Sequence, residues 1–234
     1  MKKQKKQRDR APLLTRLFDH KMWAWDFVRI TGFIPILCWF RLKRIFVTST
    51  GRRKRGMLRG KYLVASNHMS FIDPGIMLCA FWGRRLNFVA TDDLFKSKQG
   101  GFFKWLGLIP VNKQNVSVET FKRVQETLYR GHIVGVFPEG SVHGEGVKTF
   151  KSGIVMMAVM SGADIVPMYI SKRTNAWHRQ VVLIGEKIIL KEHVSSEFPT
   201  MEEIENLTQL LIERELQLEQ IDRERQANKK GKRK

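Results

Sequence analysis

The sequence KYLVASNHMSFIDPG, at residues 61–75, indicates the architecture of this chain. It opens with apolar residues of the kind that form buried strands. It closes with Asp73 before Pro74, and proline suits the first turn of a helix but disfavours a helical conformation in the residue before it. A short polar turn with His68 lies between the two parts. The stretch therefore predicts a strand, a turn and a helix, with Asp73 as the N-cap of that helix.

Strand and helix patterns alternate along the rest of the chain. Strands are predicted at residues 61–66, 86–90, 108–111, 133–137, 165–170 and 180–184. Helices are predicted at residues 74–82, 95–106, 118–130, 153–161 and from 201 to about 225, the last preceded by a capping box of Thr200 and Glu203. This alternation is typical of an α/β domain, so we expect a mostly parallel mixed sheet flanked by helices.

The N-terminal region has a different composition. Residues 30–40 (ITGFIPILCWF) are its longest uncharged run, which is short of the roughly 20 apolar residues of a membrane-spanning helix. Trp23, Trp25 and Trp39 suit a membrane interface. We expect a basic tail and a membrane-interfacial helical motif in residues 1–46, the α/β domain in 47–200, and a C-terminal helix with a basic tail in 201–234. A buried core helix is the alternative for the N-terminal segment.

The net charge of +20 points to an anionic partner. Residues 41–61 carry nine lysines and arginines and no acidic residue. Beside an aromatic interfacial segment this run favours an anionic membrane surface. No zinc-finger spacing, RNP-type strand or heptad-linked basic region accompanies it, so nucleic acid is not the expected partner.

The two cysteines lack metal-ligand spacing and no secretory signal is visible. We expect a peripheral or monotopic protein on the cytoplasmic side of the cell membrane.

His68 and Asp73 are the first candidate catalytic residues. Within one helix, side chains five residues apart would point about 140° apart, but on a turn they can converge. An aspartate that accepts from one ring nitrogen leaves the other free to take a proton from a hydroxyl. The alternative is that Asp73 only caps the helix and His68 is an ordinary loop histidine. Ser70 is expected to brace the turn, because no GxSxG motif surrounds it.

A second motif, VGVFPEGS at residues 134–141, ends another predicted strand. The carboxyl ends of parallel strands lie at one edge of a sheet, where α/β proteins form ligand clefts. Glu139 can hydrogen-bond a substrate hydroxyl there, and Gly140 permits close approach of the backbone. The alternative is a tight turn with a solvated Glu139.

Four blocks occur in a characteristic order: NHMSFID (67–73), GLIPVNK (107–113), VFPEGS (136–141) leading to TFKSG (149–153), and IVPMYI (165–170). With them the chain resembles the 1-acylglycerol-3-phosphate acyltransferases, also called PlsC-type glycerolipid acyltransferases, over about residues 61–184. The resemblance implies acyl transfer from acyl-carrier protein or coenzyme A to the sn-2 hydroxyl of lysophosphatidic acid. His68 would be the general base and Asp73 its orienting partner. No metal or cofactor is implied beyond the acyl thioester.

The resemblance also implies an acceptor site. Its substrate-binding residues would be Lys113, Glu139, Gly140, Ser141, Lys148 and Lys151, with Asn67, Ser70 and Pro167 in support. Lys113 stands where the family has arginine, and Val142 replaces a second arginine. A different lysophospholipid or a lyso-aminolipid therefore remains an alternative acceptor. The distant alternative is a non-catalytic basic protein that binds membrane or nucleic acid.

Overall fold

The computed structural model describes residues 27, 31, 41–48, 58–98, 100–112, 116–138, 150, 152–173, 179–194 and 199–231. Their strands form a seven-stranded sheet in the order β1-β7-β6-β2-β5-β3-β4, which confirms the expected mostly parallel mixed sheet. Among the strands of the described residues, only β6 and β7 pair antiparallel. The strands are β1 (Lys43–Phe46), β2 (Tyr62–Ser66), β3 (Leu86–Thr91), β4 (Ile109–Val111), β5 (Ile133–Val136), β6 (Asp164–Ile170) and β7 (Val181–Ile184).

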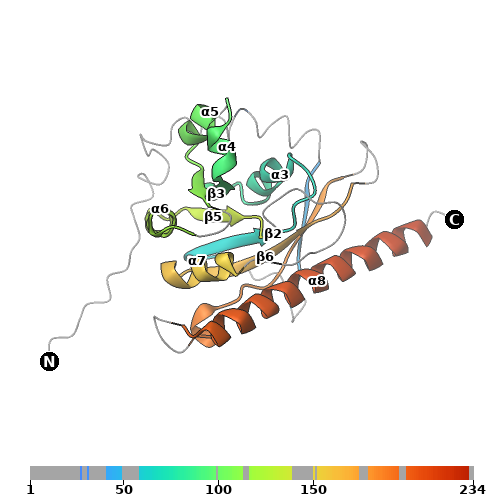
Figure 1. The fold of residues 1–234 in the computed structure, drawn as a ribbon. Coiled ribbons are helices and arrows are strands. Elements are labelled where there is room, and N and C mark those ends of the chain that lie inside the picture. Colours follow the sequence, from blue (N-terminus) through green and yellow to red (C-terminus); the bar gives the residue numbers. More distant parts are fainter. Residues whose placement is uncertain are drawn as a thin grey trace.

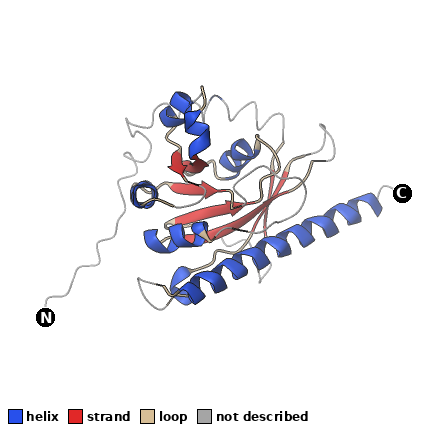
Figure 2. Cartoon of the chain, viewed as in Figure 1, coloured by secondary structure: helices blue, strands red, loops and turns tan. Residues whose placement is uncertain are grey.

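Helices cover both faces of the sheet (Figures 1 and 2). They are α3 (Asp73–Ala80), α4 (Asp92–Lys96), α5 (Gly100–Trp105), α6 (Val118–Tyr129), α7 (Gly153–Ser161) and α8 (Met201–Gly231), with a short 3₁₀ helix at Leu190–Glu192. One hydrophobic cluster joins Tyr62 and Val64 of β2 to α3. Another joins Leu63 and Ala65 of the same strand to α6, α7 and α8. Alternate residues of β2 thus enter opposite cores, which is why apolar side chains occupy both faces of the strand up to Ala65.

The parallel register brings the two candidate motifs, after β2 and after β5, to one edge of the sheet. In β2, Leu63 lies opposite Val134 of β5 on one side and Ile165 of β6 on the other. The three strands run in the same direction, so the residues that follow them emerge together. The turn after β2 therefore lies beside Phe137 after β5 and Ser171 after β6.

Several expected boundaries are corrected. Residues 43–46 were assigned to the N-terminal motif, but they form edge strand β1, paired with β7. The helix expected at 95–106 is two helices, because Ser97 is extended and Gly100 lies so close to Phe95 that a Cβ would be 2.0 Å from the Phe95 carbonyl oxygen. Helix α8 continues to Gly231.

Only Phe27 and Thr31 are described within residues 1–40, and both are helical. The Thr31 hydroxyl donates to the Phe27 carbonyl at 2.7 Å. The rest of the expected interfacial motif lies outside the described residues. Within the described parts of the chain, no helix combines the length and the apolar character needed to cross a membrane.

Candidate active site

The site is built on the turn between β2 and α3, and the Asp73 carboxylate holds that turn together. Its Oδ2 accepts hydrogen bonds from the backbone N–H groups of Met69, at 2.6 Å, and Ser70, at 2.7 Å. The backbone N–H of Asp73 donates in return to the Ser70 carbonyl at 3.0 Å. Asp73 is 2% exposed, and a buried carboxylate needs such donors to compensate for lost hydration.

The predicted capping role of Asp73 is therefore wrong. Asp73 is the first residue of α3, and the N-cap is Ile72, which makes no side-chain capping bond. The carboxylate turns back toward the preceding turn instead of forward to the helix. It does so because two backbone N–H groups of that turn, together with the imidazole, offer three donors to one oxygen.

The expected contact between His68 and Asp73 is confirmed. The imidazole Nδ1 lies 3.0 Å from Asp73 Oδ2, and the His68 side chain is 15% exposed. With an ionised carboxylate as acceptor, Nδ1 carries the proton and Nε2 is the basic nitrogen. Among the described residues, Nε2 has no hydrogen-bond partner. The arrangement can therefore accept a proton from an incoming hydroxyl.

An aromatic stack supports the imidazole from its face, and the sequence did not indicate it. The His68 ring stacks on Phe137, with centroids 4.1 Å apart and planes inclined by 20°. Phe88 of β3 continues the stack. Its ring centroid lies 6.1 Å from that of Phe137, and the two ring planes are inclined by 6°. The ring of His68 is thus restrained at its edge by a carboxylate and on its face by an aromatic ring. The adjacency of β2 and β5 is the signal that would have predicted this contact.

Three residues predicted as supporting groups lie in or beside this site. Asn67 is 1% exposed; its amide donates to the Ile170 carbonyl at 3.2 Å and its oxygen accepts from the Ile170 N–H at 2.7 Å. The Ser70 hydroxyl accepts from the Ile72 N–H at 3.4 Å, within the turn. Pro167 lies in β6 opposite Ala65 of β2. Their functional roles remain predictions.

The predicted substrate-binding residues lie outside the described residues: Lys113, Glu139, Gly140, Ser141, Lys148 and Lys151. Their roles also remain predictions. The described part of the FPEG motif ends at Pro138, one residue after the phenylalanine that stacks on His68. In the described ranges no group of three or more histidine, cysteine, aspartate or glutamate side chains is arranged to hold a metal ion.

The chain is similar to known acyltransferases. A family model described as "Acyltransferase" matches residues 44–171, from β1 to the end of β6. A Bacillus subtilis protein named 1-acyl-sn-glycerol-3-phosphate acyltransferase is 26% identical over 164 residues, which cover 68% of this chain and 81% of that protein. A Borreliella burgdorferi protein of the same name is 22% identical over 193 residues, covering 80% of this chain and 76% of its own length.

The fold also matches a solved structure. The crystal structure of the Thermotoga maritima 1-acyl-sn-glycerophosphate (LPA) acyltransferase PlsC superposes with a TM-score of 0.55 at 19% identity. The match covers 87% of this chain and 81% of that one. At this identity the likeness supports the α/β fold alone.

Proposed function

Because the chain belongs to the PlsC-type acyltransferase family, we propose that it moves a fatty acyl group from an acyl thioester to the sn-2 hydroxyl of lysophosphatidic acid, which gives phosphatidic acid. The names of the Bacillus subtilis and Borreliella burgdorferi relatives support this acceptor. The observation that carries the proposal is the 3.0 Å contact between His68 Nδ1 and the buried Asp73 carboxylate. The acyl donor is acyl-carrier protein or coenzyme A in thioester linkage.

His68 is the general base of the proposed reaction. Its Nε2 takes the proton of the acceptor hydroxyl while that oxygen attacks the thioester carbonyl carbon. The carbon–sulfur bond then breaks, and the imidazolium returns its proton to the departing thiolate. Atoms and charge balance without a protein nucleophile, a metal or a further cofactor.

Asp73 and Phe137 both favour the transient imidazolium. The carboxylate lies at hydrogen-bond distance from Nδ1, so it opposes the positive charge that His68 gains. The face of Phe137 against the ring adds a weaker attraction of the cation–π kind. Neither residue needs to move during the reaction, so both act as preorganised electrostatic partners.

The acceptor headgroup is the first point to test. Val142 and Lys113 replace arginines of the family pattern, which is the reason for a second candidate: another lysophospholipid or a lyso-aminolipid. Purified protein would be assayed with lysophosphatidate, lysophosphatidylcholine, lysophosphatidylethanolamine and a lyso-aminolipid, with each thioester donor in turn. We expect the highest kcat/KM with lysophosphatidate. A preference for an acceptor without a phosphate monoester would overturn the choice of acceptor and leave the chemistry intact.

The decisive variant is His68→Ala. Removal of the base should lower kcat by several orders of magnitude, beyond the roughly 10²–10⁴ usual for a general base, because nothing else activates the hydroxyl. Lysophosphatidate acylation measured beside circular dichroism tests this. His193→Ala removes an exposed histidine at the end of the 3₁₀ helix and should leave the rate unchanged.

The same variant distinguishes the enzyme from a non-catalytic binding protein. A basic protein that only binds membrane or nucleic acid would show no acylation in the wild type and no change in binding on His68→Ala. A His68→Ala variant that keeps a tenth of the wild-type rate would contradict the assignment of the base.

A further inference from the structure

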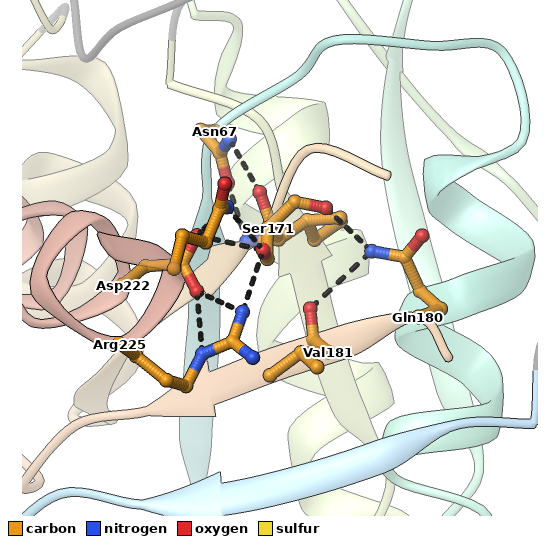
Figure 3. Close-up of polar contacts among 8 residues, drawn as sticks. Asn67, Ser171, Gln180, Val181, Asp222 and Arg225 are labelled. Atoms are coloured by element: carbon orange, nitrogen blue, oxygen red, sulfur yellow. Dashed lines mark hydrogen bonds and ion pairs between the residues drawn. The ribbon is translucent and has the colours of Figure 1, made fainter. Parts of the chain in front are cut away.

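Helix α8 reaches the catalytic edge of the sheet through one buried aspartate. Asp222 is 2% exposed. Its Oδ2 accepts from the Ser171 hydroxyl at 2.6 Å and from Gln226 Nε2 at 2.8 Å. Its Oδ1 accepts from Arg225, with Nε at 3.0 Å. Every contact of this carboxylate is with a donor, and Figure 3 shows Asp222 and Arg225 converging on Ser171.

Ser171 is the residue on which these contacts converge, directly after β6. It is 3% exposed. Its N–H donates to the Val181 carbonyl at 3.0 Å, and its own carbonyl accepts from Gln180 Nε2 at 2.7 Å. Arg225 Nη2 donates to its hydroxyl at 3.1 Å. The strand end is therefore fixed by β7 on one side and by α8 on the other (Figure 3).

The residue before Ser171 holds the catalytic turn. Ile170 bonds the Asn67 side chain through both its N–H and its carbonyl, at 2.7 and 3.2 Å. Asn67 precedes His68 in the chain. The path from α8 to the imidazole thus runs through Asp222, Ser171, Ile170 and Asn67, and each step is a hydrogen bond between buried groups or a single peptide link.

We propose that Asp222 is a positioning residue for the acyl transfer: it fixes the end of β6, and through Ile170 and Asn67 it holds the backbone that carries His68. This inference rests on the proposed function. The family model ends at Ser171, so α8 lies outside the region that this model matches.

Asp222→Asn is the sharpest test. The variant keeps the shape of the side chain but turns an NH₂ group toward donors on Ser171, Arg225 or Gln226, so at least one bond is lost. We expect kcat to fall between about threefold and thirtyfold, as the loss of one to two such bonds allows. The KM values should change less than twofold, because a displaced base acts on the transition state more than on substrate binding.

Asp164→Asn is the matched control, at the opposite end of the same strand. Asp164 accepts from Lys187 Nζ and from the Leu190 N–H, at 2.6 and 3.2 Å, so it also anchors β6 to a neighbouring segment. We expect a comparable fall in melting temperature with kcat unchanged. An equal loss of kcat in both variants would mean that any damage to β6 slows the enzyme and would overturn the inference.

Two further readouts follow the path itself. Amide hydrogen exchange of Ile170 should accelerate in Asp222→Asn but not in Asp164→Asn, since only the former loosens the bond to Asn67. Asn67→Ala should slow the reaction, and adding Asp222→Asn to it should have little further effect on kcat, because both act on one path. Additive effects would overturn the inference.

If the wild type itself transfers no acyl group, the proposed function fails. If the wild type is active and Asp222→Asn is as fast, only this inference fails.

Discussion

His68 is restrained in two independent ways. Asp73 fixes the edge of the imidazole at 3.0 Å, and Phe137 covers its face at 4.1 Å between centroids. An in-plane hydrogen bond sets the tautomer, whereas a stacked ring limits rotation about the side-chain torsions. Together they restrain the imidazole while Nε2 keeps no hydrogen-bond partner among the described residues. In the proposed reaction, a base held in this way would meet its substrate with little loss of conformational entropy.

Tyr62 lies on β2, the strand before the His68 turn, and its position is purely structural. Its side chain is fully buried, and its hydroxyl has no hydrogen-bond partner among the described residues. Burial raises the pKa of Tyr62 to about 12, and the Arg84 guanidinium opposes the shift. Because the folded-state pKa is raised, the protein keeps its full stability below the unfolded pKa of 10.0 and loses stability as the pH rises toward 12, where the buried phenol must ionise.

Tyr62→Phe should therefore stabilise the protein. Removal of a buried, unsatisfied hydroxyl should raise the free energy of unfolding by about 1 kcal/mol at neutral pH. The variant should also lose less stability than the wild type above pH 10. Urea unfolding at neutral and alkaline pH measures both effects. Burial also raises the pKa of Cys79, from 9.0 to about 11, so part of the alkaline loss should remain in the variant. A destabilised Tyr62→Phe would show that the hydroxyl has a partner.

At the scale of elements, β5 packs closely against α3 and lies beside β3 in the sheet. A Cβ at Gly135 would lie 2.8 Å from Met77 Sδ and 2.8 Å from the Phe88 ring. Phe88 stacks in turn on Phe137, which contacts His68. The absence of a side chain at Gly135 therefore leaves the space in which Phe88 lies, and Phe88 in turn positions the Phe137 ring that stacks on His68.

Gly135→Ala should reduce stability and activity together. Overpacking should lower the free energy of unfolding by about 1–3 kcal/mol. The displaced Phe88 should also lower kcat, measured at a temperature where the variant stays folded. Gly83→Ala is the control, because a Cβ there has nothing within 4 Å and should change neither quantity appreciably. A folded Gly135→Ala variant with the wild-type kcat would show that the stack can shift without consequence.

For the whole molecule, the net charge of +20 favours anionic partners. Such a field raises the local concentration of anionic lipid and of phosphorylated acceptor, and salt screens it. The densest basic run, at residues 52–55, lies outside the described residues, so its role rests on composition. We propose that the chain associates with the anionic surface of a membrane, where its acceptor is found.

Vesicle binding tests this association. We expect sedimentation with anionic vesicles at low salt, much weaker sedimentation with zwitterionic ones, and release as the salt concentration rises. Neutralising Arg52, Arg53, Lys54 and Arg55 to glutamine should cost about 1 kcal/mol of binding free energy per residue. Equal binding to both kinds of vesicle would exclude an electrostatic origin. Stronger, salt-dependent binding to duplexes of any sequence would favour nucleic acid instead.

Local sequence patterns were sufficient to predict most of the helices and strands and the contact between His68 and Asp73. The predicted capping box of Thr200 and Glu203 is confirmed, with reciprocal bonds of 2.8 and 3.1 Å. Helix α7 begins and ends at the predicted residues. His68 and Asp73 meet because a single turn joins them. In each case the interacting residues lie within a few positions, so backbone geometry alone limits where they can go.

Contacts between distant segments could not be inferred in this way. Phe137 against His68, Asn67 against Ile170 and Asp222 against Ser171 all depend on which strands are neighbours and in what register. A shift of one residue in a strand reverses the face of every side chain, and nothing in a single sequence specifies that register across 50 or 100 positions. The chain's own pattern of residues therefore determined an α/β domain with the His68–Asp73 pair on a turn. The packing of β5, β6 and α8 around that turn determined what holds the imidazole in place.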